Sequence, residues 1–366
     1  MPELPKTIII CSTSLHEYDR RLQRISGSLS DAGYKVVWIS RTKNETEQQQ
    51  NEKKVKHLIV QTTFKSGPLF YLEFNWRVRK LVKSISADIV CAVDLDTIIG
   101  TSWATDIGNT SLIFDAHEIY YEVPELIGKP LKKAIWQWIA RKYLPHLKAA
   151  YTVNHSLKLH YQKYGLQYEV IRNVPPIKES KTLLPPAPRQ NNKVLVYLGV
   201  LNAGRGLEIY MAAMTKLPEY RLLIIGEGDL SEELRAKAGN DPAITFTGYL
   251  KPTEIFEALS HAAIGLNLLK AESLNYKLSL ANKFFDYMHA GLPSINMAYP
   301  EYQQIINEHP VGTMLESYDT IDFVNAVTAL EDKALYSQLS TTALKAIDLY
   351  NWEREEQKLL AFYEQL

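Results

Sequence analysis

The stretch IFDAHEIYYEVPE (113–125) sets His117 beside Glu118, directly after an apolar run that is typical of a buried strand. A neighbouring imidazole and carboxylate can bind a metal ion, transfer protons, or satisfy each other inside a core. The zinc-protease pattern H-E-x-x-H requires a histidine where this chain has Tyr121, and no Cys/His cluster lies nearby. We therefore expect no metal at this pair.

A loop in the second half of the chain combines glycines with an arginine. In YLGVLNAGRGLEIYMAAM (197–214), Gly199, Gly204 and Gly206 lie between an apolar strand and a helix, with Arg205 among them. Glycines let a backbone approach a phosphate, and a helix N-terminus with an arginine favours an anion. The spacing G-x4-G-x-G matches neither the dinucleotide fingerprint nor a P-loop, so the loop alone is a weak signal.

Two further stretches could complete a nucleotide site. Glu227 stands between two glycines at the end of the next strand, where close contact with a ring or a sugar is possible; the alternative is an ordinary turn. Asn282 and Lys283 open a helix, and Asp286 follows one turn later. A lysine there suits a diphosphate and a carboxylate suits ribose hydroxyls, the alternative being a plain packing helix.

The order of the elements predicts what positions these residues. Apolar runs separated by amphipathic segments predict parallel strands covered by helices, at 7–13, 35–40, 56–62, 88–94, 111–117 and 149–154, and again at 193–199, 220–228, 244–250, 262–269 and 293–298. The fold class is therefore α/β, with two Rossmann-like doubly wound domains facing a cleft. We expect the domains at 1–175 and 193–348, a proline-rich linker at 176–192, and a final amphipathic helix at 349–366.

Composition narrows the classes of function. The chain has 366 residues, of which 46% are hydrophobic and 22% charged, and its net charge is zero. Cys11 and Cys91 lie in apolar runs, which predicts buried thiols and a reducing compartment. No run is long enough to span a membrane. These features favour a cytoplasmic protein and give no reason to expect a nucleic-acid partner.

Charge is unevenly divided between the two halves. Residues 1–180 carry 25 Lys and Arg against 18 Asp and Glu, whereas residues 181–366 carry 16 against 23. The segment KPLKKAIWQWIARKYLPHLK (129–148) adds aromatic residues to its basic ones. Such a helix can lie on an anionic membrane surface; the alternative is that Ile135, Trp138, Ile139 and Leu144 pack on the sheet.

Two acidic motifs in the first half leave alternatives open. Asp19 and Arg20, in the loop after the first strand, are plausible contacts for a bound substrate, although Asp19 could instead cap a helix. Asp94 and Asp96 form an Asp-x-Asp pattern after an apolar strand, and two carboxylates placed in this way could hold Mg²⁺ or Mn²⁺ against a diphosphate. The second α/β domain argues against that metal-dependent interpretation.

Several stretches together resemble a known family. They are DRRLQRISGSLSDAGYKVVWIS (19–40), AVDLDTIIG (92–100), FDAHEIYYEVPE (114–125), GVLNAGRGLE (199–208), LIIGEGDL (223–230), FTGYL (246–250), NKFFDYMHAGLP (282–293) and NWERE (351–355). In order and spacing the chain is similar to glycosyltransferases of the GT-B fold in family 4, also called glycosyl transferases group 1. Within that family it resembles bacterial members with an FDAHE stretch.

The resemblance implies a retaining transferase that requires no metal and no cofactor. A nucleotide-diphosphate sugar would be held by the C-terminal domain and the acceptor by the N-terminal domain, onto which the 349–366 helix would pack. Asp19 and Arg20 are then plausible acceptor contacts. Arg205 and Lys283 match positions that neutralise the diphosphate, and Asp286 matches a ribose ligand. His117 would touch the transferred sugar or its phosphate, and Glu118 would orient neighbours or the acceptor. The alternative for His117 is a core histidine bonded to Asp115 or Glu118.

The chain also departs from the family pattern. The first acid of the Glu-x7-Glu motif falls at Leu278, the usual base after the first glycine is Val200, and SLHEYDRRL (14–22) replaces an N-terminal Gly-Gly loop. We expect transfer to a glycan or polyprenyl-linked acceptor in bacterial cell-surface polysaccharide synthesis, by a cytoplasmic protein that can be peripheral on the inner membrane face. The alternatives are a nucleotide-sugar epimerase and a non-catalytic sugar-nucleotide-binding partner of another transferase.

Overall fold

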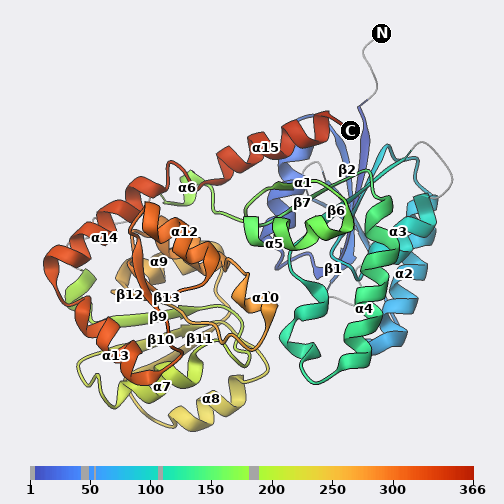
Figure 1. The fold of residues 1–366 in the computed structure, drawn as a ribbon. Helices are drawn as coiled ribbons and strands as arrows, with labels where there is room; N and C mark the ends of the chain where they lie inside the picture. The colour runs from blue at the N-terminus through green and yellow to red at the C-terminus, as the bar shows by residue number, and fades with distance from the viewer. Residues whose placement is uncertain (1–4, 43–48, 53–54, 106–109, 181–188) are drawn as a thin grey trace. The chain divides into compact units, whose positions relative to one another are not determined.

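The computed structural model describes residues 5–42, 49–52, 55–105, 110–180 and 189–366. The described chain forms two compact units, one of Met1–Arg172 with Glu355–Leu366 and one of Asn173–Arg354 (Figure 1). Part of the predicted linker, residues 181–188, lies outside the described residues. None of the described helices combines the length and the apolar character that crossing a membrane requires.

The first unit is built on an eight-stranded sheet in the order β3-β4-β2-β1-β5-β6-β7-β8. Its strands are parallel except β3, which runs antiparallel to β4. The strands are β1 (Thr7–Leu15), β2 (Lys35–Arg41), β3 (Gln49–Glu52), β4 (Val55–Ile59), β5 (Ile89–Val93), β6 (Ser111–Ala116), β7 (Ala149–Thr152) and β8 (Tyr168–Val170). All six strands expected in this half are present, with β3 and β8 in addition.

Helices cover both faces of this sheet because its central strands are apolar on both sides. They are α1 (Arg20–Asp31), α2 (Gly67–Lys83), α3 (Ile98–Thr105), α4 (Pro130–Tyr143) and α5 (His155–Tyr161). Phe70, Phe74 and Val78 of α2 pack with Ile9 and Cys11 of β1 on one face. On the other face, Tyr363 of α15 (Trp352–Glu364) lies 3.4 Å from Tyr151 of β7, hydroxyl to hydroxyl. Cys11 and Cys91 are buried free thiols, as predicted.

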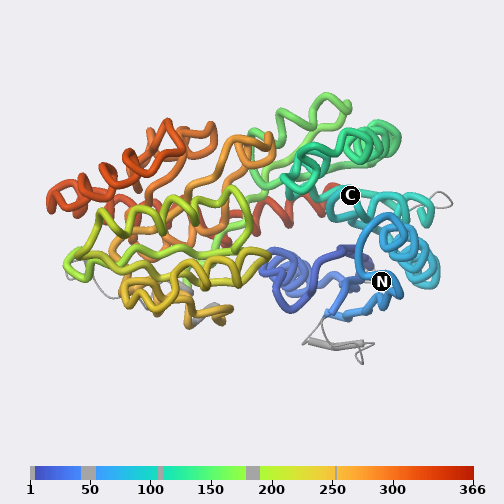
Figure 2. Tube along the Cα trace, turned by 90° about the horizontal axis from the view of Figure 1, so that it is seen from below, coloured from blue at the N-terminus to red at the C-terminus, as the bar shows by residue number. Residues whose placement is uncertain are grey.

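Figure 2 follows the first unit from blue to green and shows the red C-terminal segment joining it. Within this unit, α15 is tied to the end of β8. The Arg172 backbone N–H donates to Glu355 Oε2 at 2.9 Å, and Ser28 of α1 donates to Glu356. The last residues of the chain are thus part of the core of the N-terminal unit.

The second unit has a six-stranded, fully parallel sheet in the order β11-β10-β9-β12-β13-β14. Its strands are β9 (Val194–Leu198), β10 (Arg221–Ile225), β11 (Ile244–Gly248), β12 (Ile264–Asn267), β13 (Ser294–Met297) and β14 (Gly312–Leu315). Its helices are α6 (Ile177–Ser180), α7 (Leu207–Met214), α8 (Ser231–Ala238), α9 (Pro252–His261), α10 (Leu274–Lys277), α11 (Asn282–His289), α12 (Pro300–Glu308), α13 (Thr320–Ala329) and α14 (Lys333–Ala346).

Short 3-10 helices complete the described chain at Tyr120–Glu122, Pro124–Leu126, Leu144–His146, Gln162–Tyr164 and Arg189–Asn192. The two sheets with alternating helices confirm the predicted class of two doubly wound α/β domains. In each sheet, the carboxyl ends of the parallel strands meet at one edge, where ligands of such folds bind. The glycine loop after β9, Glu227 after β10 and His117 after β6 directly follow such strand ends, whereas Asn282, Lys283 and Asp286 lie on α11.

Candidate functional site

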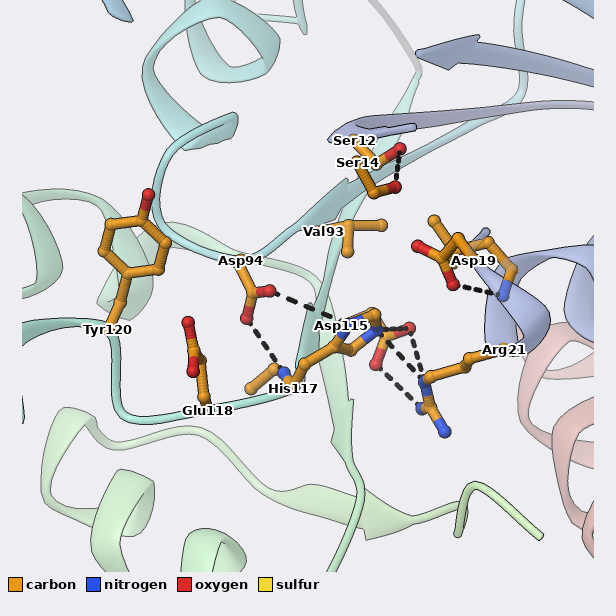
Figure 3. Close-up of polar contacts among 12 residues, drawn as sticks. Ser12, Ser14, Asp19, Arg21, Val93, Asp94, Asp115, His117, Glu118 and Tyr120 are labelled. Carbon is orange, nitrogen blue, oxygen red and sulfur yellow. Dashed lines mark hydrogen bonds and ion pairs between the residues drawn. The ribbon is translucent and has the colours of Figure 1, made fainter. Parts of the chain in front are cut away.

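In the first unit, three side chains converge where β6 ends. Arg21 of α1 donates to Asp115 with two N–H groups, Nη2 to Oδ1 at 2.8 Å and Nε to Oδ2 at 3.2 Å. His117 adds a third contact to the same carboxylate, Nε2 to Oδ2 at 2.8 Å (Figure 3). Arg21 also donates from Nη1 to the carbonyl of Ile171 at 2.8 Å. Arg21 and Asp115 are both buried, so the pair is a desolvated, bidentate ion pair.

The charge of His117 follows from this arrangement. Burial lowers the pKa of the imidazole, but Asp115 and then Asp94 outweigh that effect and raise the pKa to about 9. Burial likewise raises the pKa of Asp115, but Arg21 and His117 bring it down to about 2. At neutral pH, His117 is therefore a cation with 22% of its side chain exposed. The bond to Asp115 is the one expected of a core histidine, the alternative given above for His117. The exposed part of the ring can still contact a ligand.

Asp94 sits in the left-handed backbone region, with φ of 57°. This conformation is uncommon for a residue other than glycine and is sustained here by contacts on both sides. Its Oδ1 accepts the His117 backbone N–H at 2.9 Å, and its Oδ2 lies 3.7 Å from His117 Nδ1. Asp94 thereby fixes both the backbone and the ring of His117.

Asp96 belongs to a different set of contacts. It is buried and accepts hydrogen bonds from the hydroxyls of Thr13 and Tyr120, the latter at 3.1 Å. Burial raises the pKa of its carboxyl to about 6. The two acids of the Asp-x-Asp pattern therefore have different partners, and no group of three or more metal-binding side chains occurs among the described residues. Glu118 is half-buried, and its carbonyl accepts from the Tyr161 hydroxyl at 2.7 Å.

Asp19 and Arg20 stand at the first turn of α1. Asp19 is the N-cap, and its Oδ1 accepts the backbone N–H of Leu22 at 3.0 Å. Capping, the alternative left open by the sequence, is therefore present; an acceptor contact by either residue stays a prediction. The next residue, Arg21, reaches the His117 cluster and is not among the site residues predicted from the sequence.

In the second unit, the glycine loop joins β9 to α7. Gly199, Gly204 and Gly206 all have positive φ, at 140°, 74° and 82°. A side chain at Gly206 would place its Cβ 2.5 Å from the Tyr210 ring, so this position excludes larger residues. Only glycine therefore allows the chain to turn sharply enough to enter α7 here.

The predicted cations of this unit come together beside the loop. Lys283, in the first turn of α11, places Nζ 3.6 Å from the centroid of the Tyr197 ring, and the guanidinium of Arg205 lies 5.4 Å from that of Tyr276. A Cβ on Gly199 would lie 3.4 Å from Lys283 Nζ. The structure thus brings Gly199, Arg205 and Lys283 together from two separate segments.

Lys283 is buried, and its ammonium has no hydrogen-bond partner among the described residues. Arg205 Nε is likewise buried without one. Burial, and then the charge of Arg205, lower the pKa of Lys283 well below its ordinary value. A guanidinium and a lysine amine that rest on aromatic rings, with unused N–H groups, form a site prepared for an anion, which would also favour the protonated form of Lys283.

The remaining predicted donor residues are less clearly placed for binding. Glu227 is paired with Arg235, whose Nη1 lies 3.1 Å from its Oε2. Asn282 is exposed at the start of α11, and Asp286 is buried one turn later. Of the departures from the family pattern, the two in this unit are Val200, which is exposed, and Leu278, which is the C-cap of α10. The roles of Glu227, Asn282 and Asp286 in donor binding stay predictions.

Two families match most of the chain. Residues 19–176 match Glycosyltransferase Family 4, and residues 192–333 match Glycosyl transferases group 1. The chain is a GT-B glycosyltransferase of family 4. The family and the transferase activity predicted from the sequence are thereby confirmed, whereas the FDAHE subgroup stays a prediction.

Solved structures of the same fold match this family 4 glycosyltransferase along nearly its whole length. Sucrose-phosphate synthase from Thermosynechococcus elongatus is 15% identical with a TM-score of 0.83, covering 98% of both chains. Anabaena HepE in complex with UDP and glucose is 15% identical with a TM-score of 0.76, covering 98% of this chain and 99% of that one. Sulfoquinovosyl transferase SQD2 of Arabidopsis thaliana is 25% identical over 170 residues, 45% of this chain but only 32% of that protein.

Proposed function

We propose that this glycosyltransferase moves a sugar from a nucleotide-diphosphate donor, held by the second unit, to a glycan or lipid-linked acceptor, held by the first. The observation that carries the donor proposal is the pair of Arg205 and Lys283 beside the glycine loop, both with buried, unused N–H groups. A diphosphate supplies the oxygen acceptors that these groups lack. The complex of the similar HepE with UDP and glucose is in line with such a donor.

The proposed chemistry is electrostatic. When the bond between the sugar and the diphosphate breaks, negative charge grows on the leaving phosphate oxygens. Cations already in position stabilise that charge without reorganisation, and Lys283 and Arg205 supply them. Retention of configuration and a front-face attack, in which a donor phosphate oxygen takes the acceptor's proton, are proposed from the family resemblance. His117, cationic at neutral pH, is proposed to donate to the transferred sugar or its phosphate.

The proposed reaction needs no metal ion. In the first unit, Asp94 is engaged by the backbone and ring of His117, and Asp96 by Thr13 and Tyr120. A transfer assay on protein treated with EDTA tests this part of the proposal. Unchanged activity is the expected result, whereas loss of activity with recovery on adding Mn²⁺ would overturn it.

The donor is tested by thermal-shift titration with UDP-, GDP-, ADP- and CMP-sugars, since a ligand that binds the folded state raises its apparent stability. One donor class should stabilise the wild type but not Lys283→Ala. Lys216, exposed in the same unit, provides the matched control Lys216→Ala. A turnover assay with the stabilising donor then decides the reaction: binding without transfer or hydrolysis would favour a non-catalytic binding protein, and interconversion of free donors an epimerase.

For the acceptor side, we propose a polysaccharide-building role with a polyprenyl-linked or glycan acceptor, carried out at the membrane surface through residues 129–148. Support comes from the exposure of Arg141 and Lys142 together with Trp138 on α4. The alternative in which Ile135 and Trp138 pack on the sheet is wrong, since both are exposed; Ile139 and Leu144 are the buried residues of that set. A lipid-linked acceptor that is used faster on anionic vesicles than in detergent would support this role.

A further inference from the structure

Two neighbouring helices of the first unit repeat the same outward-facing pattern. On α2, Leu69 is followed seven residues later by Trp76 and eleven residues later by Lys80; on α4, the same offsets lead from Leu131 to Trp138 and Lys142. All six side chains are exposed, the four apolar ones between 48% and 81%. In both helices the lysine lies over the tryptophan ring, Nζ to centroid, at 3.5 Å for Lys80 and 5.0 Å for Lys142.

The exposure of these residues is a matter of helix phase. On α2, Phe70, Phe74 and Val78 pack on the sheet, which leaves the Leu69–Trp76–Lys80 side facing away from it. On α4, Ile139 and Ala140 are the buried residues, and the Leu131–Trp138–Lys142 side is opposite. Further apolar side chains extend both patterns, Leu72 on α2 and Ile135 on α4.

The two helices that carry the stripes are in contact and run in the same direction. The ring of Tyr71 on α2 meets that of Trp136 on α4, with centroids 5.2 Å apart. Each helix links two strands of one parallel sheet, β4 to β5 and β6 to β7, so both begin at the carboxyl ends of the strands (Figure 1). The leucines therefore share one end of the helix layer, the tryptophans its middle, and the lysines the other end.

We propose that α2 and α4 together form a membrane foot, defined by Leu69, Leu72, Trp76, Lys80, Leu131, Ile135, Trp138 and Lys142, that dips its leucine end into an anionic bilayer. At about 1.5 Å per residue, the backbone of each tryptophan lies about 10 Å and that of each lysine about 16 Å from the backbone of its leucine along the helix. That order matches acyl chains, the aromatic interfacial layer and lipid phosphates in turn. A protein partner would not require this order of depth on both helices.

The foot also gives the proposed acceptor a direction of approach. Tyr120, which bonds Asp96 beside His117, packs against Trp136 of α4 with ring centroids 4.6 Å apart. Lys133 of α4 is paired with Glu122 of the same loop at 2.7 Å. The leucine end therefore adjoins the strand edge that carries His117. This last step rests on the proposed function, because a lipid-linked acceptor held in the bilayer would then meet the edge where the candidate residues lie.

Co-sedimentation of the full chain with vesicles tests the foot without any donor or acceptor. Binding is expected to phosphatidylcholine vesicles containing phosphatidylglycerol, and to weaken with salt. Leu72→Glu with Leu131→Glu, or Lys80→Glu with Lys142→Glu, should each weaken binding by at least about tenfold. Leu159→Glu, on α5, is the matched control because Leu159 is equally exposed but lies outside the foot.

Insertion depth is tested with an environment-sensitive dye. Because Cys11 and Cys91 are buried, a thiol-reactive dye can be directed to Leu131→Cys or Leu159→Cys. A blue shift with anionic vesicles is expected at position 131 and none at 159. The proposal would be overturned if the leucine variants bound vesicles as well as the wild type does, or if the wild type bound neutral vesicles equally well. Self-association through this face in place of vesicle binding would also overturn it. Donor-induced thermal shifts, measured on the same variants, report on the second unit and so separate failure of the foot from failure of the proposed function.

Discussion

Lys283 holds its ammonium 3.6 Å from the centroid of the Tyr197 ring, buried and without a hydrogen-bond partner among the described residues. The aromatic face offers partial compensation, because the ring quadrupole attracts a cation but accepts no hydrogen bond. Unused hydrogen-bonding capacity in a buried group lowers stability. A residue placed in this way is expected to serve ligand binding at the expense of folding.

Replacing Lys283 with methionine should therefore separate stability from activity. Lys283→Met removes the buried amine but keeps most of the packing, so the free energy of unfolding should rise by about 1–3 kcal/mol. Donor binding and transfer should fall by at least about a hundredfold, the loss of one charge-assisted contact to phosphate. Urea unfolding and donor titration measure the two effects. Lys216→Met, at an exposed lysine, should change neither, and a destabilised Lys283→Met would count against the buried amine as a strained group.

Donor binding should also take up protons. The pKa of Lys283 is lowered well below its usual value by burial and then by Arg205, and an arriving diphosphate reverses the balance by adding negative charge. The bound state then holds more protons than the free state, so proton uptake is expected near the lowered pKa. Calorimetric titration in buffers of different ionisation enthalpy measures it. Lys283→Met should bind weakly with no buffer dependence; a wild-type binding enthalpy that is the same in every buffer contradicts the prediction.

Much of the fold could be predicted because buried parallel strands are short apolar runs. TIIICST and KVVWIS, for example, became β1 and β2. The strands that escaped prediction lack that signal: β3 (Gln49–Glu52) is polar, β8 (Tyr168–Val170) has three residues, and both are edge strands. The edge strand β14 (Gly312–Leu315) is as long as β12 and β13, but a glycine and a threonine interrupt its apolar residues, so it gives no continuous apolar run.

The candidate sites were predictable only where the signal is local. The glycine loop and the start of α11 can each be recognised from a few consecutive residues, so Arg205 and Lys283 were predicted as site residues. Arg21 and Asp115 are 94 positions apart, and no local sequence pattern predicts that they form a contact. One sign was present: Arg21 lies four residues before Ile25 on the buried stripe of α1, so helical spacing could have shown that it, and not Arg20, turns inward.

The stability contributed by His117 should disappear at high pH. Its folded-state pKa of about 9 lies above the ordinary value of 6.5, so the folded protein binds the proton more tightly than the unfolded chain. The contribution is complete below about pH 6.5 and is lost as the pH rises through 9. It amounts to up to about 3 kcal/mol. His117→Gln should therefore be less stable than the wild type at pH 6 and nearly equal to it near pH 10, measured by urea unfolding. A constant difference at all pH values would show that the imidazole is not cationic in the fold.

The Arg21–Asp115 pair predicts a strong coupling. Asp115→Asn leaves the buried guanidinium without its counter-charge, which should destabilise the protein by about 3–5 kcal/mol. Arg21→Met leaves the buried carboxylate with His117 alone and should be destabilising as well. The double variant should lose less free energy of unfolding than the sum of the two single losses, by at least about 1 kcal/mol. Additive effects in this double-mutant cycle would mean that the pair is not coupled, whatever its geometry.

The two interpretations of Asp19, helix cap and acceptor contact, can be separated by replacing one carboxylate oxygen with an amide nitrogen. The cap bond needs an oxygen acceptor for the Leu22 N–H, which asparagine supplies and alanine does not. If capping is the whole role, Asp19→Ala should lose about 1 kcal/mol of stability, Asp19→Asn should lose little, and both should keep the KM for the acceptor. If the carboxylate also contacts the acceptor, Asp19→Asn should raise that KM while leaving the unfolding midpoint in urea almost unchanged. Acceptor titrations and unfolding curves of the two variants therefore distinguish the roles, with Asp31→Asn, at the last residue of the same helix, as the control for loss of charge.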